Sequence, residues 1–414
     1  MHFSTKSIAG SVCRRARLIG ASKSESGQPS RNPVDAAVIR QPAVPPFFAV
    51  ASLDALFGAA IWTPALSWAQ PWLTGPSAGD WHRQILLYGT FPAMLAGFLL
   101  TALPRWTGRS RPRNAVSKFL LALWVAARAS YVLGPYGSGP AIAAVFLFAL
   151  TVTTAVYVIS SRDRRNYKIV LLLCGFSASA AMTAASYQVG LTSRLSLAAM
   201  TGLLMVVGGR VIPALTAAYL CNSGAPLVPA PLAVVEKASA AAAALALTFW
   251  IAMPDAQVTA VACAACASLQ LARATQWRGW QVRLPAAVAA LHVGYCWIGL
   301  GFALLALHIL VPLHVSTAAG VHAWTVGAFG TMSLAIMGSM IRKHSGLAFA
   351  RSIRATAAYA AMTGAAVTRV GGELIASHGS VLLALSGGLW LVAFLLFIAA
   401  FHQPLLVRGC PPDR

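Results

Sequence analysis

Four of the nine histidines lie at levels of the chain where imidazoles could pair as ligands. His82 lies in "DWHRQ" and His322 in "GVHAWTVGAFGTM", while His292 lies in "ALHVGYCW" and His344 in "RKHSG". Neutral imidazole is the commonest metal ligand in proteins, and a haem iron takes one or two axial imidazoles. These four residues are therefore the candidate metal ligands. The simpler alternative is that each ring only forms a hydrogen bond at the end of a helix.

Arg210 is a cation inside an apolar segment, where a charge costs at least about 2.5 kcal/mol unless it has a partner or a cavity. It lies in "GGRVIPAL", in which Pro213 frees a backbone carbonyl. We expect a broken helix there, with Arg210 lining a polar cavity within reach of the helix face that carries His292. The guanidinium would pair with a haem propionate or another anion. Capping by carbonyl groups of a neighbouring helix is the alternative.

Two further arginines lie inside apolar segments. Arg369 has Glu373 four residues later, a spacing that favours an ion pair on one helix face, although a contact with a cofactor stays open. Arg128 has no carboxylate nearby in the sequence, and we assign it no role.

The composition shows which elements must position these residues. Hydrophobic residues make up 58% of the 414, and only 10% are charged, which excludes a soluble globular protein. From Pro46 onward, segments near the roughly 20 apolar residues that cross a bilayer recur twelve times. The expected helices cover residues 46–66, 84–103, 117–135, 139–160, 168–188, 195–220, 233–253, 255–273, 287–310, 318–341, 353–376 and 380–402. The fold class is therefore all-α, a polytopic membrane protein with about twelve transmembrane helices.

The net charge of +22 indicates the orientation of these helices rather than a nucleic-acid partner. With the N-terminus in the cytoplasm, 25 of the 31 Lys and Arg residues fall in cytoplasmic segments and two, Arg83 and Arg194, in outer loops. Short cytoplasmic loops are the ones enriched in basic residues, so we expect both termini in the cytoplasm. Residues 1–45 are polar and basic and should form a disordered tail, residues 46–403 the membrane domain, and residues 404–414 a C-terminal tail.

This topology puts His82 and His322 at the outer surface of the bilayer, and His292 and His344 toward the cytoplasm. We expect the imidazoles of His82 and His322 to meet at one iron or one copper. Gly327 and Gly330 then give the helix of His322 a smooth face, against which a flat macrocycle or another helix would pack.

The residues beside His82 suggest further contacts. Trp81 would lie in the interfacial region of the bilayer, and Arg83 would pair with a haem propionate. In the competing interpretation, His82 only begins a helix and forms a hydrogen bond with Asp80 or with water.

Other haem and redox classes are excluded or disfavoured. Cys263 and Cys266 form a C-x-x-C, but Ala267 follows where covalent c-type haem attachment needs a histidine. A haem-copper oxidase needs adjacent histidines on one helix, and the sequence has none.

The sequence resembles the NnrS family of bacterial inner-membrane proteins, which have twelve helices and are associated with denitrification and nitric oxide. The resemblance runs from Pro46 to His402 and rests on the order and spacing of several motifs. These are "PFF" at 46–48, "WH" at 81–82, "AGFLLTALPRWTG" at 96–108, "RNYK" at 165–168, "GRVIPALT" at 209–216, "LHVGYCW" at 291–297, "HAWTVGAFGTMSLAIM" at 322–337 and "HSG" at 344–346.

The resemblance implies haem and copper as cofactors, nitric oxide as a partner and a role against nitrosative stress. The motifs that match include His82, Arg210, His292, His322 and His344, and we add Arg83, Trp106 and Arg369 as candidate cofactor contacts. Whether the protein is catalytic stays open.

The chain also departs from the family pattern. After the histidine of "WH" the family usually has a second histidine and a glutamate, where this chain has Gln84 and Ile85, and Arg105 replaces an asparagine. Gly338 and Ser339 replace a threonine and an arginine. Haem is therefore a firmer expectation than copper. A secondary transporter for a small anionic substrate is the alternative function, because a proline-broken helix beside a buried arginine suits an anion.

Overall fold

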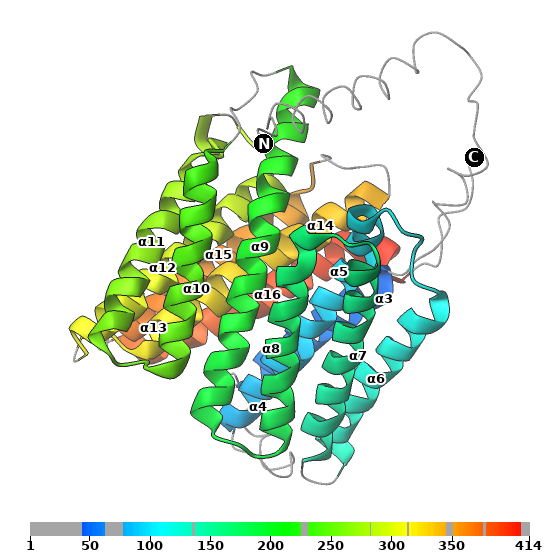
Figure 1. The fold of residues 1–414 in the computed structure, drawn as a ribbon, viewed down its shortest axis with the longest axis horizontal. Coiled ribbons are helices and arrows are strands. Elements are labelled where there is room, and N and C mark those ends of the chain that lie inside the picture. Colours follow the sequence, from blue (N-terminus) through cyan, green and yellow to red (C-terminus); the bar gives the residue numbers. More distant parts are fainter. Residues whose placement is uncertain are drawn as a thin grey trace.

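The protein is a bundle of helices (Figure 1). The computed structural model describes residues 44–62, 78–134, 137–224, 231–281, 283–312, 314–344, 351–375 and 378–406. Within these ranges every regular element is helical and none is a strand, which confirms the all-α class.

The described helices form twelve segments in chain order, as predicted. Two of the segments contain a π-helical turn, η2 or η5, between two α-helices. Their bounds are α3 (Val44–Trp62); α4 (Ala78–Ile85), η2 (Leu86–Thr90) and α5 (Phe91–Thr107); α6 (Asn114–Leu133); α7 (Ser138–Ser160); α8 (Tyr167–Ala184); α9 (Val189–Ser223); α10 (Ala233–Ala252); α11 (Gln257–Thr275); α12 (Ala286–Leu310); α13 (Thr317–His322), η5 (Ala323–Gly330) and α14 (Thr331–His344); α15 (Ile353–Leu374); and α16 (Gly379–Leu406).

Ten of the described segments are long and apolar enough to cross a membrane, so the chain is a multi-pass membrane protein. The other two are α3, whose apolar part is the shorter helix Pro46–Ala60, and α15. The observed bounds follow the predicted ones within a few residues for most segments, because each helix must supply a continuous apolar run.

The predicted break at Pro213 is wrong. Helix α9 runs unbroken for 35 residues, from Val189 to Ser223, and contains Pro213. Proline is tolerated in a membrane helix when packing against neighbouring helices compensates for the freed carbonyl. Here α9 packs against α8, α10 and α12 along its length.

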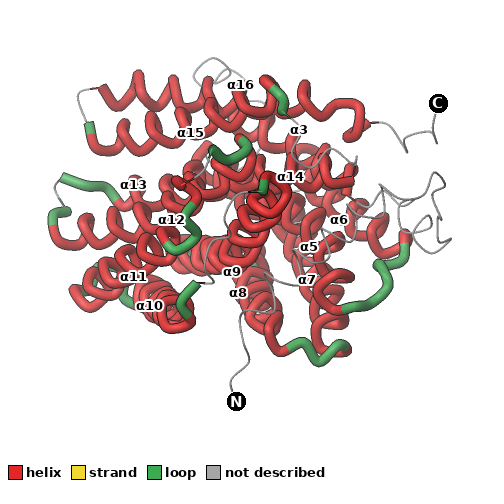
Figure 2. Tube along the Cα trace, turned by 90° about the horizontal axis from the view of Figure 1, so that it is seen from above, coloured by secondary structure: helices red, strands yellow, loops and turns green. Residues whose placement is uncertain are grey.

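Three helical segments form the centre of the bundle. In the apolar part of Gly79–Thr107, 94% of the residues are buried, and the share is 72% in Val189–Ser223 and in Thr317–Lys343, against 22–39% in six of the other spans. Figure 2 shows α9 and α14 between the group α10–α12 and the group α5–α7. His82, Arg210 and His322 all belong to these central segments, which hold their side chains inside protein rather than in lipid.

The two π-helical turns lie in two of the central segments, and these segments touch through one aromatic contact. A π turn is rare and often marks a functional site. The turn η2 begins four residues after His82, and η5 begins directly after His322. Phe91, the residue after η2, lies edge-on to Phe329 of η5, with ring centroids 5.2 Å apart. Each predicted ligand is thus followed by a widened helical turn.

Candidate functional site

His82 on α4 and His322 on α13 are the two residues predicted to meet at one metal, and the metal site itself stays a prediction. Helices α4 and α13 both lie in the lower half of Figure 1. The two imidazoles are close enough to interact electrostatically, and the guanidinium of Arg369 interacts with both of them. Both histidines are partly buried. Residues 240 positions apart, on two different segments, therefore interact electrostatically, and Arg369 is a cation common to both.

The ring of His322 has a defined orientation. Its Nδ1 lies 2.7 Å from the carbonyl oxygen of Ala318 on the preceding turn. A carbonyl can only accept, so Nδ1 donates the hydrogen bond, and the lone pair of the neutral ring is on Nε2. Metal-binding histidines are commonly held in this way by a backbone carbonyl. Nε2 is therefore the atom of His322 that would bind a metal.

Arg369 and Glu373 form the predicted ion pair and position the helix of His322. Arg369 Nη1 lies 2.5 Å from Glu373 Oε1. The other carboxylate oxygen accepts a hydrogen bond of 2.7 Å from Ser316, the residue at the start of α13. Glu373 thus joins α15 to the start of the helix that ends at His322.

The surroundings of His82 differ from one of the predictions. Arg83 pairs with Asp80, three residues earlier, while a hydrogen bond of His82 with Asp80 stays a prediction. The interfacial location of Trp81 is wrong, since its side chain is only 3% exposed and its ring lies 6.0 Å from that of Tyr131. The reason is that α4 begins inside the bundle, against α3 and α6, rather than at its lipid-facing edge.

Of the second pair of histidines, the structure describes the side chain of His292 only. His292 Nε2 lies 3.0 Å from the hydroxyl of Thr216 on α9, and its ring packs edge-on against Trp277, 6.0 Å away. Gly279 has no room for a Cβ because the ring of His292 fills that space. This is the simpler, hydrogen-bonded arrangement. His344 ends α14, and its side chain lies outside the described residues.

Arg210 and Trp106 form a separate cluster. The guanidinium lies 5.5 Å from the centre of the Trp106 ring and donates hydrogen bonds to the Asn166 side chain and, at 2.6 Å, to the carbonyl of Arg165. Arg210 is therefore capped by a backbone carbonyl, which was the alternative prediction. Its hydrogen-bond partners lie between α7 and α8. No contact among the described residues joins Arg210 to His292. A cofactor contact for Arg210 or Trp106 stays a prediction.

A partly buried ionic network around Arg273 was not predicted from the sequence. Arg273 forms a two-pronged ion pair with Glu236, with Nε–Oε1 and Nη2–Oε2 distances of 2.8 and 2.6 Å. It also donates to the hydroxyl of Tyr295 at 2.7 Å, and Tyr295 donates to Gln270 at 2.6 Å. Gly209 leaves the space that the guanidinium occupies. The pair joins residues 37 positions apart, so no local spacing could have indicated it.

A second feature that was not predicted is that Arg128 lies near a buried acid, while its own buried guanidinium nitrogens form no hydrogen bond among the described residues. Asp54 on α3 is 7% exposed and accepts a hydrogen bond of 2.8 Å from Thr90, and its carboxylate interacts electrostatically with Arg128 on α6. The guanidinium of Arg128 lies over the ring of Tyr131, 4.4 Å from its centre. A Cβ on Gly89 would stand 2.5 Å from Arg128 Nη1 and 2.7 Å from Asp54 Oδ2, so only glycine fits there.

The described helices, with ten candidate spans and a buried histidine pair, define a polytopic membrane protein. Among models of known protein families, the one described as NnrS protein matches residues 44–408 of this chain. That range includes every described helix. The chain belongs to the NnrS family. No individual curated protein matches it.

Proposed function

We propose that this chain is a haem-binding membrane protein of the NnrS type that handles nitric oxide or protects the cell from nitrosative stress. The observation that supports the proposal best is the meeting of His82 and His322 from two central segments, beside Arg369. One haem iron needs one or two imidazoles, and this cluster offers two.

The residues present fit a haem better than a bare metal ion. Among the described residues no group of three or more His, Cys, Asp or Glu side chains converges, whereas a protein metal site usually takes at least three such ligands. His322 would bind through Nε2, and His82 would bind from the other segment. Arg369 would balance an anionic group of the cofactor. A bound haem would supply an iron that takes nitric oxide as a ligand.

Copper has less support in this chain. Gln84 and Ile85 stand where the family usually has a histidine and a glutamate, and neither supplies an imidazole or a carboxylate. A copper ion bound by two imidazoles alone would need further ligands. We therefore propose copper only as a second cofactor after haem.

The alternative of an anion transporter loses its main argument. Transporter sites are typically built from discontinuous helices whose freed ends face the substrate. Helix α9 is continuous through Pro213, and the guanidinium of Arg210 already binds the Asn166 side chain and the Arg165 carbonyl.

The absorbance spectrum of the purified protein tests the haem proposal. We expect a Soret band near 400–430 nm, a range general to haem proteins, and about one haem per chain after expression with a haem precursor. Nitric oxide added to the reduced protein should shift this band. Chain that stays folded but shows no Soret band, even after addition of haem, would contradict the proposal and favour the transporter.

We further propose that the protein lies in the bacterial inner membrane with both termini in the cytoplasm. Fusions truncated after Ser77 and after Arg111 are then expected to place a reporter on opposite sides, because one helical segment separates the two positions. Alkaline phosphatase should be active only after Ser77, and green fluorescent protein should fluoresce only after Arg111. Equal activity of either reporter at both positions would show that the orientation is wrong.

A further inference from the structure

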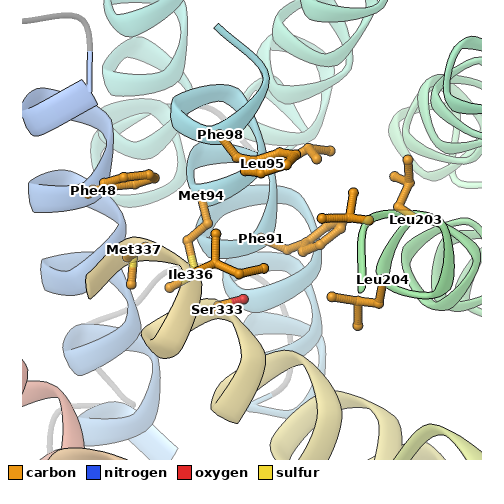
Figure 3. A pocket seen from close by; sticks show the side chains of 11 residues that line it. Phe48, Phe91, Met94, Leu95, Phe98, Leu203, Leu204, Ser333, Ile336 and Met337 are labelled. Carbon is orange, nitrogen blue, oxygen red and sulfur yellow. The ribbon is translucent and has the colours of Figure 1, made fainter. Parts of the chain in front are cut away.

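A small apolar cavity lies in the centre of the bundle, between α3, α5, α9 and α14 (Figure 3). Its volume is about 40 Å³, and all eleven residues that line it are buried. Three phenylalanines, two methionines and one serine are among them: Phe48, Phe91, Phe98, Met94, Met337 and Ser333.

The lining excludes most kinds of ligand. Ser333 supplies the only polar side chain of the lining, and no charged residue takes part. A buried water needs two to four polar partners, so water is held poorly here, and an ion would have no counter-charge. The volume is close to that of one small molecule, which excludes a haem or an ordinary metabolite. Only a small apolar species remains.

We propose that this cavity binds an apolar molecule of diatomic size, such as nitric oxide or dioxygen. Dry cavities lined by aliphatic and aromatic side chains bind apolar ligands, including xenon. The aromatic rings and the two thioethers add polarisable contacts, which strengthen dispersion attraction. Binding itself is independent of the haem proposal, whereas the use of the bound gas rests on the proposed function.

The position of the cavity gives the bound gas a role. Phe91 lines the cavity and also touches Phe329 of η5, the turn that follows His322. At the other end, Phe98 lines the cavity and packs edge-on against Trp106, 5.6 Å away. The cavity therefore lies between the segment of the histidine pair and the Arg210–Trp106 cluster. It would store gas taken from the bilayer between these two groups of residues.

Xenon binding tests the cavity without any need for haem. In purified full-length protein, ¹²⁹Xe nuclear magnetic resonance with saturation transfer should detect a bound pool. We expect Leu204→Phe, which fills the cavity, to weaken xenon binding about tenfold or more, because the atom loses its contact surface. Leu95→Ala, which enlarges the cavity, should strengthen it. Leu171→Phe is the matched control, since Leu171 is 72% exposed on α8.

Three results would overturn the inference. These are no bound xenon in the unchanged protein, equal binding in Leu204→Phe and Leu171→Phe, and a co-purified lipid acyl chain in the cavity that xenon does not displace. The enlarged variant keeps the test decisive if Leu204→Phe fails to fold, because unaltered binding in Leu95→Ala also contradicts it. The absorbance spectrum is a separate measurement, so failure of the haem proposal is distinguishable from failure of this one.

Discussion

Replacing either His82 or His322 with alanine is expected to lower the haem content of the purified protein by about tenfold or more. The reason is that each variant removes one of the two imidazoles that the structure brings together beside Arg369. Haem per chain, from the Soret absorbance and the pyridine haemochrome, measures the loss. Any haem that remains should change its spectrum, because one axial ligand is gone.

Controls separate ligand loss from misfolding in this experiment. His378→Ala is the matched histidine control, because His378 is exposed at the start of the last helix. His322→Gly supplies a second measurement, since added imidazole should restore the spectrum if the ring is a ligand and should have no effect if the ring is structural. Full haem occupancy in both His82→Ala and His322→Ala would refute the paired ligands.

Glu373 should affect His322 indirectly, through the position of α13. Glu373 holds the start of α13 through Ser316, and its other carboxylate oxygen pairs with Arg369. It is therefore a positioning residue for His322. This separation of roles follows from the short length of α13, six residues from Thr317 to His322, which gives the start of the helix direct influence on its last side chain.

The fold was predictable because the membrane imposes a simple rule on each helix. A segment must be apolar over about 20 residues, so the predicted 287–310 and 353–376 correspond to α12 (Ala286–Leu310) and α15 (Ile353–Leu374). The rule acts on each segment alone. It says nothing about the course of a helix through a proline, and the continuity of α9 at Pro213 was accordingly missed.

The candidate site was predictable only where the orientation of the helices decides it. His82 and His322 lie near the starts of segments that enter the bundle from the same side, so their levels followed from the distribution of basic residues. The ion pair of Arg273 with Glu236 and the electrostatic interaction of Arg128 with Asp54 depend on which helices are neighbours. No spacing along the chain contains that information. The pattern of apolar residues also does not predict the two π turns.

The largest effect on stability is expected at the charges around Gly89. Arg128→Ala should destabilise the folded protein by about 3–5 kcal/mol, because it removes the cation that interacts electrostatically with the buried carboxyl group of Asp54. The double variant Arg128→Met with Asp54→Leu should recover most of this loss, since neither charge is then buried alone. Gly89→Ala should also destabilise the folded protein, because the added methyl group overlaps both charged groups.

Unfolding in detergent, followed by tryptophan fluorescence, measures these changes in stability. The control is Arg113→Ala, which replaces an exposed arginine just before α6. If Arg128→Ala were as stable as Arg113→Ala, or if the double variant were no better than the single one, Arg128 would not be the counter-ion of Asp54.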